Sequence, residues 1–313
     1  MENQIKNQSG FSWEKVGRYA AKIFKYALLI VFALLILLPL FWVVMSSLKT
    51  TQEINSNAFS FPKQFYFQNY VNAWNRASMG TYFGNSIFLT AASLALLVLL
   101  AVPCSYTLAR FKFRGSKAIS LIFMAGLFIN INYIVLPLHI MLFNFGKAIG
   151  IGANMTNNYF TVIVLYASTS LSFSIYLMNS YFKALSPSFE EAAKIDGCGY
   201  FKTFLYVCAP LAMPSILTVI LFNFLSYWNE YILANTFLDK AKATLPVGLL
   251  RIMRESKVAD DLGRMYAGLM IVIIPVLIVY SFVQGQLTKG ITVGGVKGRS
   301  EERRVGKECR SRW

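Results

Sequence analysis

Six long stretches without Asp, Glu, Lys or Arg constrain the fold of this chain more than any other feature. Each is long enough to hold the roughly 20 apolar residues that a helix needs to cross a bilayer. Only 14% of the residues are charged, against about 25% in a soluble domain. The sequence therefore predicts an all-α, polytopic membrane protein with six transmembrane helices. The stretches are Tyr26–Leu48, Ala77–Ala109, Ala118–Gly146, Ala148–Phe182, Thr203–Asn229 and Met265–Thr288.

Basic residues precede the first stretch, as they do in a secretory signal peptide. The stretch is far longer than the roughly 7 to 15 apolar residues of such a signal, and no small-residue cleavage site follows it. We therefore predict that it is retained as the first span. Residues 1–25 are predicted to form a cytoplasmic or interfacial segment, because Phe11, Trp13, Val16 and Tyr19 recur at helical spacing among basic residues. A helix lying in the interface and a continuation of the first span both fit this pattern.

The distribution of Lys and Arg predicts the orientation, because short loops rich in these residues stay in the cytoplasm. Five such residues precede the first span, and four more lie between Arg110 and Lys117 after the second. Both termini are then predicted to be cytoplasmic, in the plasma (inner) membrane of a bacterium. The loop between Asn229 and Met265 is also basic and argues for the opposite orientation. The two dense clusters outweigh it.

The formal charge of +16 does not indicate nucleic-acid binding, because the basic residues flank and interleave the apolar stretches. We interpret the charge as a signal of topology and of contact with membrane lipid. The terminal segment Arg299–Trp313 resembles a translated sequencing adapter. We therefore predict a transmembrane domain over residues 26–298 and a non-native tail over residues 299–313.

No metal or catalytic site is predicted. Cys104, Cys198 and Cys208 have no paired spacing, and the fourth cysteine lies in the terminal tail. His139 is the only histidine, and a lone histidine in an apolar stretch is expected to hydrogen-bond a neighbouring helix rather than to bind metal.

The missing charges also bear on the energy source. Carriers driven by protons or ions use ionisable side chains within the membrane, and the six stretches offer none apart from His139. The phosphate-binding pattern GxxxxGK[ST] is absent as well. We therefore expect this chain to bind no cofactor, and a separate ATPase that uses ATP and Mg to drive it.

The segment Ser186–Tyr200 is the candidate docking surface for such an ATPase. Its short helix is predicted to start at Ser186-Pro187, or with a capping box of Ser188 and Glu191. Gly197 is predicted to end the helix in a left-handed conformation.

One face of this helix is predicted to carry Phe189, Ala192 and Ala193. Small alanines allow close approach to another protein, and they equally allow the helix to pack on its own bundle. The residues leave both interpretations open.

Glu191-Ala192-Ala193, followed by Gly197 and Pro210, resembles the EAA loop, EAA-x3-G-x9-I-x-L-P, of ABC importer permeases. Val207 and Ala209 depart mildly from its Ile and Leu. The resemblance implies a type I ABC importer permease fold with an EAA coupling loop at about residues 183–214. The positions implied to couple to the ATPase are Glu190, Glu191, Ala192, Ala193, Asp196, Gly197 and Pro210. Further blocks resemble the second permease of carbohydrate importers of the maltose-transporter type: Ser105–Gly115, Trp228–Tyr231, Thr244–Gly248 and Lys289–Gly298.

The resemblance also implies partners. They are a second, related permease that forms a heterodimer with this chain, two ATP-binding-cassette ATPase subunits, and an extracytoplasmic sugar-binding protein. In the alternating access typical of the family, ATP binding opens the path outward and hydrolysis returns it inward. Glu191 would pair with a basic residue of the ATPase.

A path for sugar needs hydrogen-bonding side chains and aromatic faces, which Asn132, Tyr133, Asn223 and Trp228 offer within the spans. Such residues also hydrogen-bond one membrane helix to another. An alternative cargo is another polar solute, such as glycerol phosphate or a polyamine, but no charge is visible in the path. A membrane-embedded enzyme is the third hypothesis, and the loop carboxylates show no catalytic spacing that would support it.

Overall fold

The computed structural model describes residues 13–76, 78–259 and 261–285, which are mostly helical and contain no strand. Predictions for residues 1–12 and 286–313, including the adapter-like tail, lie outside the described residues. A last helix covers Leu262–Gly285. The preceding elements are α1 (Trp13–Ser47), α2 (Thr51–Ser56), α3 (Gln68–Arg76), α4 (Met79–Arg110), α5 (Ser116–Gly126), α6 (Ile131–Ala148), the 3₁₀ turn η1 (Gly152–Met155), α7 (Tyr159–Ala184), α8 (Ser188–Ile195), α9 (Tyr200–Thr203), the π-helix η2 (Phe204–Cys208), α10 (Ala209–Leu211), α11 (Met213–Trp228), α12 (Ile232–Phe237) and α13 (Leu245–Ala259).

Four of these helices are long and apolar enough to cross a membrane. Two further spans are bent pairs: α5 and α6 meet at 104°, and the segment Tyr200–Leu211 meets α11 at 70°. Counting each pair as one span gives six, so the predicted all-α fold with six spans is confirmed. The four unbroken spans are Ala21–Ser47, Met79–Arg110, Tyr159–Ala184 and Leu262–Gly285.

The six spans are not all continuous helices, because the third and the fifth are each broken. Helix α5 ends at Gly126, and the Asn130 side chain accepts a hydrogen bond of 3.0 Å from the Asn132 N–H to start α6 in a new direction. An asparagine cap satisfies a free backbone donor at a helix start, and it therefore stabilises the break. In the fifth span the break falls at Ala212, just before Pro214, whose ring cannot continue the preceding helix's hydrogen bonds.

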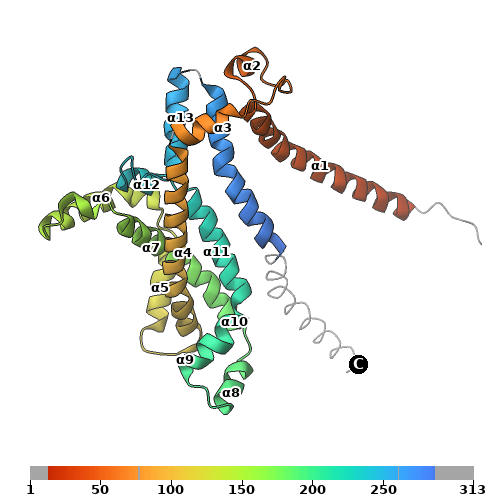
Figure 1. The fold of residues 1–313 in the computed structure, drawn as a ribbon. Helices are drawn as coiled ribbons and strands as arrows, with labels where there is room; N and C mark the ends of the chain where they lie inside the picture. Colours follow the sequence, from red (N-terminus) through yellow and green to blue (C-terminus); the bar gives the residue numbers. More distant parts are fainter. Residues whose placement is uncertain (1–12, 77, 260, 286–313) are drawn as a thin grey trace, which may run out of the picture.

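The core lies where α4 runs alongside α7 and α11 packs against both (Figure 1). Leu97 and Ala101 of α4 and Met178 of α7 are fully buried, and Val219 of α11 is almost so. Helix α5 packs on α7, and α13 packs on α4. The bundle therefore has α8 to α10 at one end and α3 and α13 at the other (Figure 1).

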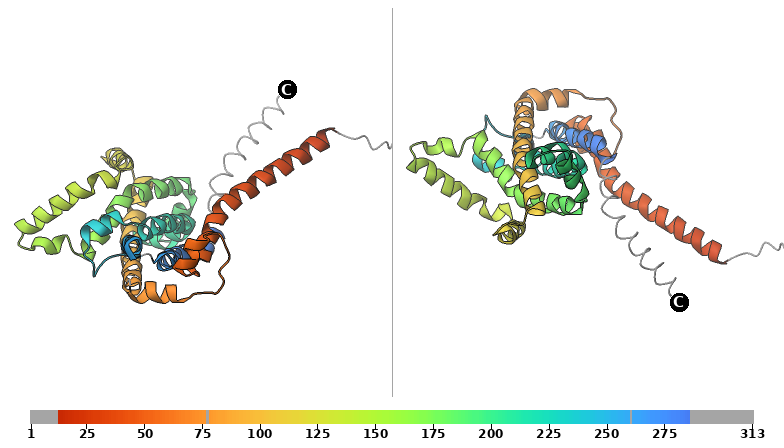
Figure 2. Two further views of the ribbon diagram at one scale, coloured as in Figure 1. Left: turned by 90° about the horizontal axis from the view of Figure 1, so that it is seen from above. Right: turned by 90° about the horizontal axis from the view of Figure 1, so that it is seen from below.

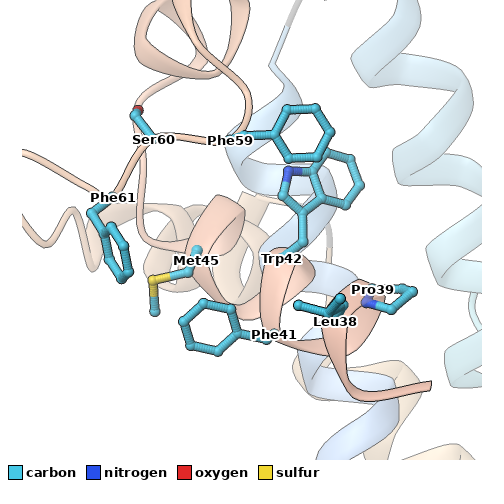
Figure 3. Close-up of a pocket in the computed structure, with 8 residues that line it drawn as sticks. All are labelled: Leu38, Pro39, Phe41, Trp42, Met45, Phe59, Ser60 and Phe61. Carbon is cyan, nitrogen blue, oxygen red and sulfur yellow. The ribbon is translucent and has the colours of Figure 1, made fainter. Parts of the chain in front are cut away.

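Helix α1 leaves this bundle, with no residue of its most apolar window buried (Figure 2). Only the last turns of α1 contact the rest of the described chain. The Trp42 indole N–H donates to Ala58 O at 2.9 Å, and Lys49, just beyond the helix, is fully buried. Beside Trp42 lies an apolar pocket of about 500 Å³ (Figure 3). Its lining is Leu38, Pro39, Phe41, Trp42, Met45, Phe59, Ser60 and Phe61. A helix that is apolar all round belongs in lipid or against another protein.

Candidate functional site: coupling loop and hydroxyl-lined pocket

Helix α8 forms the predicted docking segment. The N–H groups of Glu190 and Glu191 donate to Pro187 O at 3.0 and 3.1 Å. The helix begins at Ser188 with Pro187 at the N-cap position, and the Ser188 N–H donates to Ser186 Oγ at 3.4 Å. The capping box of Ser188 and Glu191 is therefore wrong. The reason is that the Ser188 hydroxyl lies 2.7 Å from the Ser186 hydroxyl instead of reaching the Glu191 N–H.

Gly197 ends α8 with φ at +79°, which confirms the predicted left-handed stop. Its N–H donates to Lys194 O at 3.1 Å, and the Cys198 N–H donates to Ala193 O at 2.9 Å. These bonds satisfy carbonyls that the helix end would leave free. An added Cβ at Gly197 would meet nothing within 4 Å, so backbone conformation alone calls for glycine here.

The two faces of α8 differ. Ala193 is buried against the chain's own bundle, and Glu190 is half-buried beside it. Phe189 and Ile195 are 45% and 86% exposed, and Ala192 between them is exposed too. The helix thus packs on its own bundle with one face and leaves a second, partly apolar face free. The predicted face of Phe189, Ala192 and Ala193 is split between the two. Of the other coupling candidates, Glu191, Asp196, Gly197 and Pro210 are all exposed.

Glu190 forms an ion pair with Arg110, the last residue of α4, with Nε and Oε1 2.8 Å apart. The guanidinium also donates from Nη2 to Leu185 O at 2.8 Å. In the sequence, Arg110 indicates only orientation, as one of the four basic residues after the second apolar stretch. No local pattern relates it to Glu190, because the two residues lie far apart in the chain.

A second feature is a pocket of about 750 Å³ where the third span breaks. Its walls come from the segment Gly126–Ile131, from α6, from α7 and from one residue of α11. The polar side chains of the lining are Asn130, Ser168, Thr169, Ser170, Ser172 and Ser226, and none of the lining residues is charged. Gly126 permits this geometry, because an added Cβ would overlap the Ser172 hydroxyl. This pocket was not predicted from the sequence, and the signal that could have indicated it is the cluster of hydroxyl residues between Ser168 and Ser172 in α7.

The four predicted pathway residues do not come together. Asn132 and Tyr133 are exposed in the first turn of α6, next to the pocket rim, and Tyr133 is 82% exposed. Asn223 is buried and donates to Ser174 Oγ at 3.1 Å and Val219 O at 2.8 Å. Trp228 is buried and donates to Val272 O at 3.1 Å. The last two side chains thus hold α11 to α7 and to the last helix, as polar residues do between membrane helices.

The remaining candidate groups have structural contacts. Glu230 accepts hydrogen bonds from the Leu233 N–H at 2.8 Å and from the Tyr166 hydroxyl at 2.8 Å, so it fixes the start of α12. The His139 ring packs edge-on against Phe237, with centroids 5.0 Å apart. Outside the spans, hydrogen bonds from the Asn157 amide and from a backbone N–H lower the pKa of Asp239. Within the described ranges, no three His, Cys, Asp or Glu side chains gather as metal ligands would.

Bent spans, an exposed short helix at one end of the bundle and an uncharged pocket fit a subunit of a membrane transport system. Residues 101–293 match the family described as the inner membrane component of binding-protein-dependent transport systems. The chain belongs to this family, which confirms the resemblance carried by the EAA loop.

Relatives and solved structures agree with this assignment. The chain is 35% identical to the diacetylchitobiose uptake system permease protein NgcG of Streptomyces coelicolor, over 88% of this chain and 89% of that protein. It is 30% identical to the multiple sugar-binding transport system permease protein MsmG of Streptococcus mutans, over 87% and 96%. A chain of a bacterial ABC transporter involved in the import of the acidic polysaccharide alginate superposes with a TM-score of 0.71 at 25% identity, covering 90% of this chain and 99% of that one.

Proposed function

We propose that this chain forms half of the membrane path of an ATP-binding-cassette importer for a neutral sugar or oligosaccharide. The observation that carries the proposal is the pocket at the break of the third span, which offers hydroxyl and amide groups and no charged residue. A polyhydroxylated cargo finds donors and acceptors there. A charged cargo such as glycerol phosphate or a polyamine would instead need a side chain of opposite charge in the pocket, because an unpaired charge within the membrane is costly. The sugars named for the relatives support the same cargo class.

The ATPase is supplied by partner subunits that bind Mg and ATP. The exposed face of α8, with Phe189, Ala192 and Ile195, is the surface that we assign to this contact. Its apolar side chains suit a groove, and Glu191 at its edge is exposed and available to a basic residue of the ATPase. This end of the bundle then faces the cytoplasm, together with both termini.

A second, related permease and an extracytoplasmic binding protein complete the importer. The apolar surface of α1 that this chain leaves uncovered offers room for the first partner, because such a surface is covered by lipid or by another protein. The binding protein would deliver sugar to the opposite end of the bundle, at α3 and α13. ATP binding would then open the pocket to the outside, and hydrolysis would open it to the cytoplasm.

The test uses the complete importer, purified with its partner subunits and reconstituted in proteoliposomes. Uptake of radiolabelled diacetylchitobiose and maltotriose is measured for the wild type and for Thr169→Val and Ser172→Ala. Loss of one hydrogen bond of about 1 kcal/mol corresponds to a roughly 5-fold weaker half-saturation for sugar. Ser281→Ala serves as control, because that exposed serine of the last helix only bonds Leu277 O.

Transport of a phosphate ester or polyamine in place of any sugar would refute the proposed cargo. Unchanged sugar dependence in both pocket variants would refute the role of the pocket.

A further inference from the structure

The Arg110 guanidinium joins three elements at the α8 end of the bundle. It closes α4, pairs with Glu190 in the first turn of α8, and donates to the carbonyl of Leu185, the residue that follows α7. The side chains of Arg110 and Glu190 are only 12% and 17% exposed. The Arg110 Nε lies at ion-pair distance from the carboxylate without a linear hydrogen bond. Electrostatic attraction therefore holds the pair together, and the hydrogen bond from Arg110 to Leu185 O fixes the position of the guanidinium.

Local electrostatics favour this arrangement. Arg110 lies at the C-terminus of α4, where the helix dipole attracts a cation, and Glu190 lies at the N-terminus of α8, where it attracts an anion. Exposed ion pairs contribute little, because water screens them. This pair is mostly shielded, and removal of one member would leave the other partly buried without its counter-charge.

The same cluster reaches the fifth span. The Cys208 thiol, at the end of the π-helix η2, lies 3.7 Å from Glu190 Oε1. Tyr106, one turn before Arg110, packs its ring against Phe204 of η2 with centroids 4.9 Å apart. Short π-helical segments are rare and occur often at functional sites. These contacts connect α8 directly to α4, to the end of α7 and to the bent span that leads into α11.

We infer that the Arg110–Glu190 pair is the joint through which the coupling helix moves the transport path, and that Arg110 is a positioning residue for coupling. The joint lies on the face of α8 opposite the exposed residues Phe189 and Ile195, so docking and transmission use different faces. Breaking the pair would leave the ATPase bound but would let α8 move without α4. This inference rests on the proposed function, because it presumes an ATPase docked on α8.

The variants Arg110→Gln and Glu190→Gln each remove one charge, and the exchange Arg110→Glu with Glu190→Arg restores the pair in reverse. Arg114→Gln is the matched control, since it removes the same charge from an exposed position in the loop that follows α4. Reconstituted complexes are compared for copurified ATPase subunit, ATP hydrolysis and uptake of radiolabelled diacetylchitobiose. We expect each single variant to retain its ATPase subunit but to spend roughly 5-fold more ATP per sugar, a factor typical of coupling between sites. The exchange should recover part of the loss, and the control should match the wild type.

A measurement independent of sugar separates this inference from the proposed cargo. Ser226 is exposed in the pocket, so a cysteine introduced there can be labelled with a maleimide. The labelling rate is measured with and without ATP and vanadate, and the chain without the introduced cysteine gives the background. Nucleotide should change the labelling rate when this cysteine is the only substitution, and much less when Arg110→Gln is added. A wild type that takes up no sugar but shows this response would overturn only the cargo. Normal nucleotide response and normal ATP cost in both single variants, or loss of the ATPase subunit from them, would overturn the joint.

Discussion

Replacing Gly197 by aspartate tests the coupling loop most directly. Gly197 adopts a φ of +79°, where an L-residue costs about 1–2 kcal/mol. No atom lies within 4 Å of an added Cβ, so the cost comes from the backbone and not from a clash within this chain. A strain of this size lowers the population of the docking shape by roughly 5- to 30-fold. The new carboxylate would also stand beside Asp196 on the docking surface.

Gly199→Asp is the matched control. This glycine has a φ of −71°, starts α9, and has equally open space around it. Aspartate is a favoured residue at a helix start, so the same side chain and charge are expected to be neutral or stabilising there.

The assay compares membrane insertion, ATPase copurification and sugar uptake for the two variants. We expect Gly197→Asp to insert normally but to lose uptake, and Gly199→Asp to retain it. Gly197→Ala separates strain from charge, because it imposes the backbone cost of a left-handed residue without the carboxylate. Full transport by Gly197→Asp, or equal losses at both positions, would refute the assignment of this loop.

Two further substitutions, each with a matched control variant, test the opposite end of the bundle. In Gly248→Ala, the added methyl group would overlap the buried ring of Tyr82 and lower the stability by about 1–3 kcal/mol. In the control Gly84→Ala, the methyl group meets open space on α4, so this variant should be neutral or slightly stabilising. Thermal unfolding of the purified complex measures both effects. The buried ammonium group of Lys49 contacts two carbonyl oxygens and one hydroxyl of the following loop at 3.2–3.4 Å. Lys49→Met removes these contacts, so we expect the loop to be cleaved faster by proteinase K. Lys63 is exposed, and Lys63→Met should leave the cleavage rate unchanged.

The sequence predicted the features that one physical demand imposes on a continuous segment. A bilayer requires long charge-free helices, and six such stretches are visible without any knowledge of packing. The left-handed Gly197 was predictable for the same reason, since a helix stop is a local event.

Features that depend on distant or competing contacts could not be predicted in this way. Asn130 lies within an apolar stretch, where it fits helix packing as well as the cap that breaks the span. Asn223 and Trp228 have the chemistry of a sugar site, but their donors are satisfied by Ser174 and Val272 on neighbouring helices. The Arg110–Glu190 pair joins the end of α4 to the first turn of α8, and no local pattern encodes the distance between them in space.

The length of α4 explains why a joint at its end can serve transport. At about 1.5 Å per residue, its 32 residues form one rod that runs from Arg110 to the opposite end of the bundle. There the Asn85 amide donates to Ala243 O at 2.9 Å, and the Ser86 hydroxyl accepts from the Leu245 N–H at 2.8 Å, at the start of α13. A docking helix that only bound an ATPase would move without consequence for the path. Because α4 is fastened both to α8 and to the loop that carries α13, a displacement at one membrane face is passed to the other.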